Sequence, residues 1–226
     1  MSSTITKNLF KLILTTAFLA LGAGTPAGAQ EEHHSHGSHE SHEQKKDAPV
    51  AAHCEDASAR AEEKPKELRP LAALGNARAQ YELGFMYERG NGVPQDYKEA
   101  ASWYRKAAEQ GNAPAQFYLG QMYDVGKGVP QGYEEAASWY RKAAEQGEAL
   151  AQLYLGFLYA HGQGVPVDRV QAYKWYAIAA TSGNDMAVQT KRNAESEMIP
   201  TELKEAQALA DEWSAQHKMM HSMMKH

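Results

Sequence analysis

The sequence repeats itself three times with a fixed period of 36 residues. The stretch that begins at Gly75 returns at Gly111 and again at Gly147. The first two copies share 27 of 36 residues, and the second and third share 17. A period of this length is typical of a solenoid, in which each unit buries its apolar face against its neighbours. The pattern therefore favours a binding scaffold over an enzyme and places the repeats at 75–110, 111–146 and 147–182.

Each copy has the pattern of two helices joined by a glycine-rich loop. In the first copy Asn76 can cap a helix whose apolar residues recur every four positions, and Gly90-Asn-Gly-Val-Pro94 then interrupts it. Asp96, with a glutamate three residues later, is typical of a capping box that opens the second helix. The apolar stripe of that second helix contains Trp103. The sequence therefore predicts an all-α fold.

The repeats are flanked by segments that extend the predicted solenoid to 67–213. Leu68, Leu71 and Leu74 recur at helical spacing, which indicates the second helix of a half-repeat acting as an N-terminal cap. Residues 183–213 indicate two further helices without the glycine loop, as expected of an atypical terminal unit. Beyond Trp213, residues 214–226 are predicted to form a polar tail rich in methionine and histidine.

The repeated residues resemble a known family. Ala-x-x-x-Leu-Gly-x-x-Tyr, Gly-x-Gly-Val-x-x-Asp and Ala-x-x-Trp-Tyr-x-x-Ala-Ala follow one another in this order, as in Sel-1-like repeats. The resemblance implies a tetratricopeptide-like solenoid, a right-handed α/α superhelix that binds proteins or peptides. Some secreted bacterial members carry a disulfide in each repeat and are associated with β-lactam binding. This chain has a single cysteine, so that activity does not carry over.

The N-terminus has the pattern of a cleaved secretory signal peptide. Lys7 and Lys11 accompany an apolar run that ends near Leu21, and small residues follow up to Ala29. The run is too short to span a bilayer, which takes about 20 residues. We therefore expect cleavage before Gln30 and a periplasmic or secreted protein without a membrane anchor.

The composition of the mature chain excludes some partners. Removal of residues 1–29 takes away two lysines and no acid, so the net charge falls from −5 to −7. Nucleic-acid binding needs clustered Lys and Arg, which an acidic chain does not offer. Residues 30–66 are dominated by His, Glu, Lys and Ser and are predicted to be disordered.

The varying positions of the first helices are the candidates for partner contact. In helical solenoids the first helix of each repeat usually lines the concave face, so its non-repeating side chains are free to bind a protein or peptide. The alternative is that several of them simply pack between repeats. The predicted partner-binding residues are Arg78, Tyr81, Glu82, Phe85, Phe117, Tyr118, Gln121, Leu153, Tyr154 and Phe157.

Both ends of the mature chain are rich in metal-ligating residues. Imidazole binds copper, nickel and zinc, and thioethers select Cu(I), so copper is the leading candidate. The alternative is a solvated tail whose histidines are incidental. No cofactor is required by the repeats. The candidate metal ligands are His33, His34, His36, His39, His42, His217, Met219, Met220, His221, Met223, Met224 and His226.

The remaining reactive side chains give no sign of an enzyme. Cys54 could join a metal site, form an intermolecular disulfide or stay inert. His161 stands alone in the third repeat. The chain has no His-Glu-x-x-His, and its Ser-x-x-Lys, from Ser222 to Lys225, falls in the predicted tail, where no preorganised site can form. We therefore predict a non-enzymatic protein.

Overall fold

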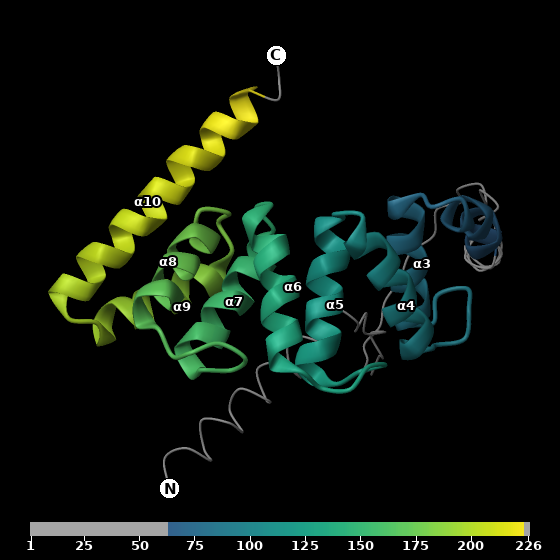
Figure 1. Cartoon of the computed structure of the whole chain (residues 1–226), viewed down its shortest axis with the longest axis horizontal. Coiled ribbons are helices and arrows are strands. Elements are labelled where there is room, and N and C mark those ends of the chain that lie inside the picture. The colour runs from purple at the N-terminus through teal and green to yellow at the C-terminus, as the bar shows by residue number, and fades with distance from the viewer. Residues whose placement is uncertain (1–62, 224–226) are drawn as a thin grey trace, which may run out of the picture. The chain divides into compact units, whose positions relative to one another are not determined.

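The computed structural model describes residues 63–223, and all regular secondary structure in that part of the chain is helical (Figure 1). The predicted all-α fold is thus confirmed. The predicted signal peptide, most of the histidine-rich segment and residues 224–226 lie outside the described residues. The labelled helices are α3 (Ala77–Arg89), α4 (Tyr97–Glu109), α5 (Ala113–Val125), α6 (Tyr133–Glu145), α7 (Ala149–His161), α8 (Arg169–Ala180), α9 (Asp185–Glu197) and α10 (Pro200–Met223).

The helices form pairs, one pair per repeat. Helices α3, α5 and α7 are the first helices of the three repeats, and α4, α6 and α8 are the second. Asn76 Oδ1 accepts a hydrogen bond from the amide of Ala79 at 2.9 Å, and Asp96 accepts from the amides at the start of α4. Gly132 occupies the Asp96 position in the second repeat and makes no capping bond. The predicted helix starts are therefore confirmed.

A glycine of each first helix lets the paired helix approach closely. A Cβ atom built on Gly120 would lie 2.8 Å from the Cδ1 atom of Tyr140, which is fully buried on α6. The equivalent glycines of the other repeats, Gly84 and Gly156, meet Tyr104 and Tyr176 in the same way. Contacts this short are not tolerated in a packed interior. The helix pair therefore depends on glycine at this position.

Repeated hydrogen bonds join each unit to the next. Arg105 on α4 donates to the Tyr123 hydroxyl on α5 at 2.7 Å, and Arg141 makes the same bond to Tyr159 at 2.9 Å. Arg69, 36 residues before Arg105, donates to Tyr87 at 3.1 Å. Residues 63–73 are helical and correspond to the second helix of a repeat, directly before the first full repeat. The predicted N-terminal half-repeat is therefore present, and the described part of its helix includes residues 63–66, which precede the predicted Glu67.

The apolar stripe predicted for this half-repeat was partly wrong. Leu68 packs against the first repeat together with the buried Ala72, whereas Leu71 is 49% exposed and Leu74 is 85% exposed. Leu68 and Ala72 are four residues apart and share one helix face, and the other two leucines lie off that face.

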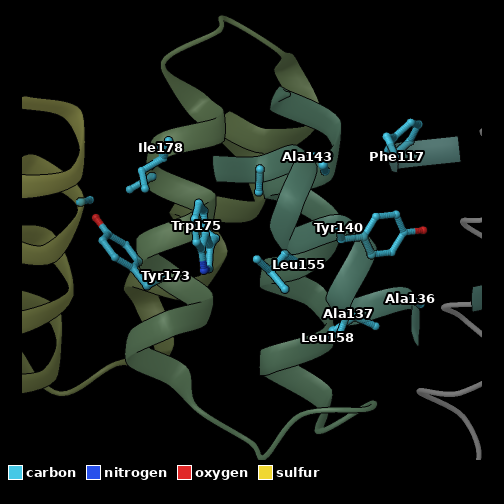
Figure 2. Packing of buried hydrophobic residues seen from close by; sticks show 14 of the residues in the cluster. Phe117, Ala136, Ala137, Tyr140, Ala143, Leu155, Leu158, Tyr173, Trp175 and Ile178 are labelled. Carbon is cyan, nitrogen blue, oxygen red and sulfur yellow. The ribbon is translucent and has the colours of Figure 1, made fainter. Parts of the chain in front are cut away.

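The C-terminal helices cover the end of the third repeat. In α8, Ala177 and Ile178 occupy the positions that Arg141 and Lys142 hold in the second repeat. Both are buried in a cluster shared with α10. Figure 2 shows Tyr173 and Ile178 reaching from α8 toward the neighbouring helix. The Tyr173 hydroxyl donates to Glu195 at 2.6 Å and contacts the side-chain oxygen of Gln207 at 3.1 Å. α9 and α10 thus close the solenoid as a cap.

The last helix is longer than the sequence pattern indicated. We expected the cap to end at Trp213, but α10 continues through residues 214–223. This stretch contains no glycine or proline and several good helix formers, so nothing in it stops the helix. The Met-rich segment is therefore helical as far as Met223.

Candidate partner-binding surface

The ten predicted partner-binding residues all lie on the first helices α3, α5 and α7. Phe117 and Leu153 are only 5% and 1% exposed, so including them was wrong. They occupy the same position in successive repeats and fill the space between one unit and the next. The other eight remain partly or fully exposed: Arg78, Tyr81, Glu82, Phe85, Gln121, Tyr118, Tyr154 and Phe157.

The aromatic rings among them form a row that crosses the repeat boundaries. We call this the aromatic row, and it comprises Tyr81, Phe85, Tyr118, Tyr154 and Phe157. The rings of Tyr81 and Phe85 lie 5.9 and 6.0 Å from Tyr118 in the next repeat. Tyr154 and Phe157 lie 6.2 Å apart in the third repeat. Rings at such separations attract one another beyond the area they bury.

Buried rings fasten the row to the core. Tyr118 stacks on Tyr104 with the ring centroids 5.3 Å apart, and Tyr154 lies 5.5 Å from Tyr140. Phe117 bridges the two halves, because it contacts Tyr118 at 5.2 Å and Tyr154 at 5.8 Å. The tyrosines of the row therefore pack between repeats and still present one edge to solvent. The alternative of packing between repeats thus holds for these tyrosines, and their role in partner contact stays a prediction.

A hollow opens at the N-terminal end of the aromatic row. Its volume is about 450 Å³, which lies within the usual range for ligand sites. Glu82 stands at its rim, with its carboxylate 3.1 Å from Lys64 Nζ and 3.1 Å from Arg78 Nε. The hydrogen bond from Lys64, together with that from Arg78, lowers the pKa of Glu82. The hollow is lined by Lys64, Tyr81, Glu82, Phe85, Met86, Gly90, Asn91 and Gly92.

The tyrosines of the row are neutral hydrogen-bond donors at physiological pH. Burial raises the pKa of Tyr81 to about 12, and the adjacent Tyr118 adds to the shift. Burial also raises the pKa of Tyr118 and of Tyr154. A neutral phenol can donate one bond and accept others while its ring makes apolar contacts. The row can therefore offer apolar area and hydrogen bonds to an extended peptide.

Two buried carboxylic acids lie beneath the row, and the sequence did not single them out. Glu88 accepts a hydrogen bond from the Tyr104 hydroxyl at 2.6 Å, and Asp124 accepts from Tyr140 at 3.4 Å. Burial raises the pKa of Asp124 to about 6, and the bond from Tyr140 offsets only part of that shift. The third repeat has Ala160 at this position. An acidic residue at the same position of the first two copies was the sequence signal that could have pointed to Glu88 and Asp124.

Asp124→Asn is expected to stabilise the protein at neutral pH. An acid whose folded-state pKa is raised binds more protons folded than unfolded, so its ionisation destabilises the fold as pH rises from about 4 to 6. The amide cannot ionise. At pH 7.5 the gain should reach at most about 3 kcal/mol, and it should disappear near pH 4. Urea unfolding at both pH values measures it, and a gain of equal size at pH 4 would contradict this account.

The predicted metal ligands fall partly within the described region. His217, Met219, Met220 and Met223 lie on α10, where the three methionines are 58%, 49% and 76% exposed. His221 is placed on the same helix. Among residues 63–223 no three His, Cys, Asp or Glu side chains converge as a metal site. The other candidates lie outside the described residues: His33, His34, His36, His39, His42, Met224 and His226.

His217 makes a contact that sequence reasoning missed. Its ring stacks on Trp213 with centroids 4.3 Å apart and an interplanar angle of 14°. Trp213 in turn meets Trp175 of α8 edge-on at 6.0 Å. The spacing of four residues between Trp213 and His217 was the available signal, because such residues share a helix face.

The remaining features of the described part concern membrane association and catalysis. No helix there combines the length and apolar character needed to cross a bilayer. Ser222 lies on α10, whereas Cys54 and Lys225 fall outside the described residues. His161 ends α7, and its ring contacts Phe157 at 6.5 Å.

A family model agrees with the geometry. The Sel1 repeat model matches residues 77–112, 113–148 and 149–184, each two residues later than the periods we assigned. The difference is one of phase only, since the repeat length is the same.

Solved structures give the same fold. The chain is similar to a Sel1 repeat protein from Oxalobacter formigenes, with 37% identity and a TM-score of 0.57 over 63% of this chain and 58% of that one. It is also similar to c5321, a protective antigen with an SLR fold from uropathogenic Escherichia coli, with 30% identity and a TM-score of 0.54. That match covers 71% of this chain and 43% of the antigen. The chain thus spans less than two thirds of either relative. No match was found among curated proteins.

Proposed function

Because this chain carries three consecutive Sel1 repeats, we propose that it is an exported scaffold that binds a protein segment along the aromatic row. Sel1 repeat proteins generally serve as protein-interaction scaffolds. The observation that carries the proposal is the row itself, which has members in all three repeats, joined between Tyr118 and Tyr154 by the buried Phe117. A hollow of about 450 Å³ lies at its N-terminal end. Aromatic anchors of this kind dominate the energetics of protein interfaces.

The chemistry of the row defines the kind of partner. Glu82 is already paired with both Lys64 and Arg78, so the rim of the hollow carries one more cationic than anionic side chain. The rings of Phe85 and Phe157 and the phenol of Tyr118 offer apolar contact beside neutral donors. An extended peptide with apolar or aromatic side chains fits this surface, because its backbone carbonyls can accept bonds from the phenols.

We propose that this function is carried out in the periplasm or outside the cell, and the N-terminal sequence supports this. Residues 1–29 have the charge, apolar core and small residues of a signal peptide. The scaffold is proposed to act after cleavage before Gln30. The proposed role is non-enzymatic, since binding along the aromatic row needs no catalytic group.

Phe85→Gln combined with Phe157→Gln is expected to weaken partner capture at least tenfold, or by more than about 1.4 kcal/mol. The repeat already tolerates glutamine here, since Gln121 holds the equivalent position in α5. The measurement is cross-linked co-purification from the envelope fraction of the native host. The recovered chain should begin at Gln30.

Val167→Gln provides the matched control for this experiment. Val167 is 63% exposed in the loop between α7 and α8 and is not a member of the row, and the first two repeats have glutamine at its position. It should leave capture unchanged. If the double variant keeps its thermal unfolding temperature and captures the same partners as the parent, the row is not the binding surface.

We also propose a second role, metal handling by the two ends of the chain. The observation that favours it is that Met219, Met220 and Met223 are all exposed on α10 rather than used as core residues. Exposed thioethers next to histidines are an unusual use of apolar side chains and suit Cu(I). Copper is preferred over nickel and zinc on the softness of these ligands.

A further inference from the structure

We propose that the aromatic row and the hollow bind a proline-rich segment in the polyproline II conformation, with an acidic side chain of that segment over the hollow. This inference rests on the proposed scaffold function and names the class of segment that the scaffold would bind. It does not depend on the proposed metal-handling role.

The aromatic row repeats at the interval of one polyproline II turn. Tyr118 and Tyr154 hold the same position in α5 and α7, one repeat apart. The Phe117 ring lies 5.2 Å from the first and 5.8 Å from the second, so the sum of 11.0 Å is the greatest possible distance between the two tyrosine centroids. Helices that pack on each other stand about 8–10 Å apart. A polyproline II helix advances about 9 Å per turn of three residues, so a segment with this period can place one side chain against each tyrosine.

The hydrogen-bonding groups of the row suit a proline-rich backbone. A polyproline II helix has no internal hydrogen bonds, so its carbonyls are free to accept, and proline has no amide N–H that needs an acceptor. The row offers phenol hydroxyls as donors. The Tyr154 hydroxyl also interacts with the side-chain amide of Gln121. A phenol oxygen that accepts from an amide keeps its own hydrogen for a partner.

Two other modes of peptide binding match this surface less well. An added β-strand needs the edge of a sheet, and residues 63–223 contain no strand. An amphipathic helix uses its own carbonyls for internal hydrogen bonds, so it would leave the phenols of the row without acceptors. Aromatic-lined grooves bind proline-rich segments because the polyproline II helix loses little entropy on binding.

The charges at the hollow define one end of the segment. Lys64 and Arg78 each lie 3.1 Å from the carboxylate of Glu82. The side chains of the two cations are 56% and 85% exposed, whereas that of Glu82 is 24% exposed, so an approaching group meets positive charge first. Tyr81 and Phe85 belong both to the row and to the lining of the hollow. A segment that lies on the row therefore extends to these cations, and an acidic side chain there complements them.

Binding of synthetic peptides to the mature chain, residues 30–226, tests the inference. The probe has two glutamates followed by three Pro-Pro-Leu triplets, both termini blocked and a fluorophore on a side chain, and a second probe has the reverse order. Fluorescence anisotropy should detect binding of at least one of the two. Replacing every proline of that probe with alanine should weaken binding by at least about tenfold, because the peptide is then no longer preorganised.

Variants of the chain locate the bound peptide. Phe85→Gln combined with Phe157→Gln should weaken binding of the probe by at least about tenfold. Arg78→Gln should weaken it by about two- to fivefold and should not affect a probe with glutamines in place of the glutamates. Arg192→Gln is the matched control, since it removes the same charge from an exposed position on α9 that does not line the hollow. It should bind the probe as the parent does.

The outcomes separate this inference from the scaffold function. If the alanine probe binds as tightly as the proline probe, or if the double variant binds the proline probe as the parent does, the polyproline II assignment is overturned. If a probe with lysines in place of the glutamates binds equally well, the acidic end is overturned. If no probe binds more tightly than millimolar while the double variant still loses its partners from the envelope fraction, the inference fails and the scaffold function stands. If the double variant keeps those partners, the scaffold function fails and the inference falls with it.

Discussion

A chain that ends at Ile199 is expected to be about 5 kcal/mol less stable than the whole protein. Without α10, the side chains of Tyr173, Trp175 and Ile178 lose their cover, and all three are now less than 5% exposed. Burial of each large apolar side chain contributes about 1.5–3 kcal/mol. A loss of this size should lower the unfolding temperature by about 10–20 °C, which thermal and urea unfolding followed by circular dichroism can measure.

A chain that ends at Trp213 is the matched control for this truncation. It keeps Ala206, Ala210 and Trp213, the residues of α10 that join the core cluster, and loses only the last turns. Its stability should fall by no more than about 1 kcal/mol, because the lost residues contribute one ring stack and little buried area. If both truncations cost the same, the stabilising part of α10 lies beyond Trp213 and our view of the cap is wrong.

The sequence carried a signal for this cap that the repeat pattern alone did not use. Arg105 and Arg141 reach across to the next repeat, but the third repeat has Ala177 in their place. A loss of the arginine together with the gain of Ile178 indicates that an apolar surface, not another repeat, packs on α8. The length of α10 was not predictable in this way, since it depends on residues 214–223 having no helix breaker and not on any contact pattern.

The candidate surface could be predicted in part for a related physical reason. Varying positions were taken as free to bind, and this rule selected Tyr118 and Tyr154, which are partly exposed on α5 and α7. The same rule failed at Phe117 and Leu153, because side chains between repeats also vary where each interface has its own volume to fill. Residues that repeat show the geometry that all units share. A position that varies can contact either a partner or the neighbouring unit, and the sequence alone does not distinguish the two.

The close approach of the paired helices at the glycine of each first helix leads to the second large effect. Gly120→Ala is expected to lower the free energy of unfolding by about 2–3 kcal/mol, although alanine normally stabilises a helix by about 1 kcal/mol relative to glycine. The added methyl would lie 2.8 and 2.9 Å from ring carbons of Tyr140, whose ring is fully buried and has no room to move. Urea unfolding of the parent and the variant measures the loss.

A double-mutant cycle with Tyr140→Leu isolates that clash. Tyr140→Leu is destabilising by itself, since it leaves a cavity and removes the hydroxyl that contacts Asp124. In its background the ring carbons next to position 120 are gone, so Gly120→Ala should be neutral or should stabilise by up to about 1 kcal/mol. The coupling energy between the two sites should therefore be about 2–4 kcal/mol. An equal cost of Gly120→Ala in both backgrounds would mean that the glycine serves the backbone of α5 and not its approach to α6.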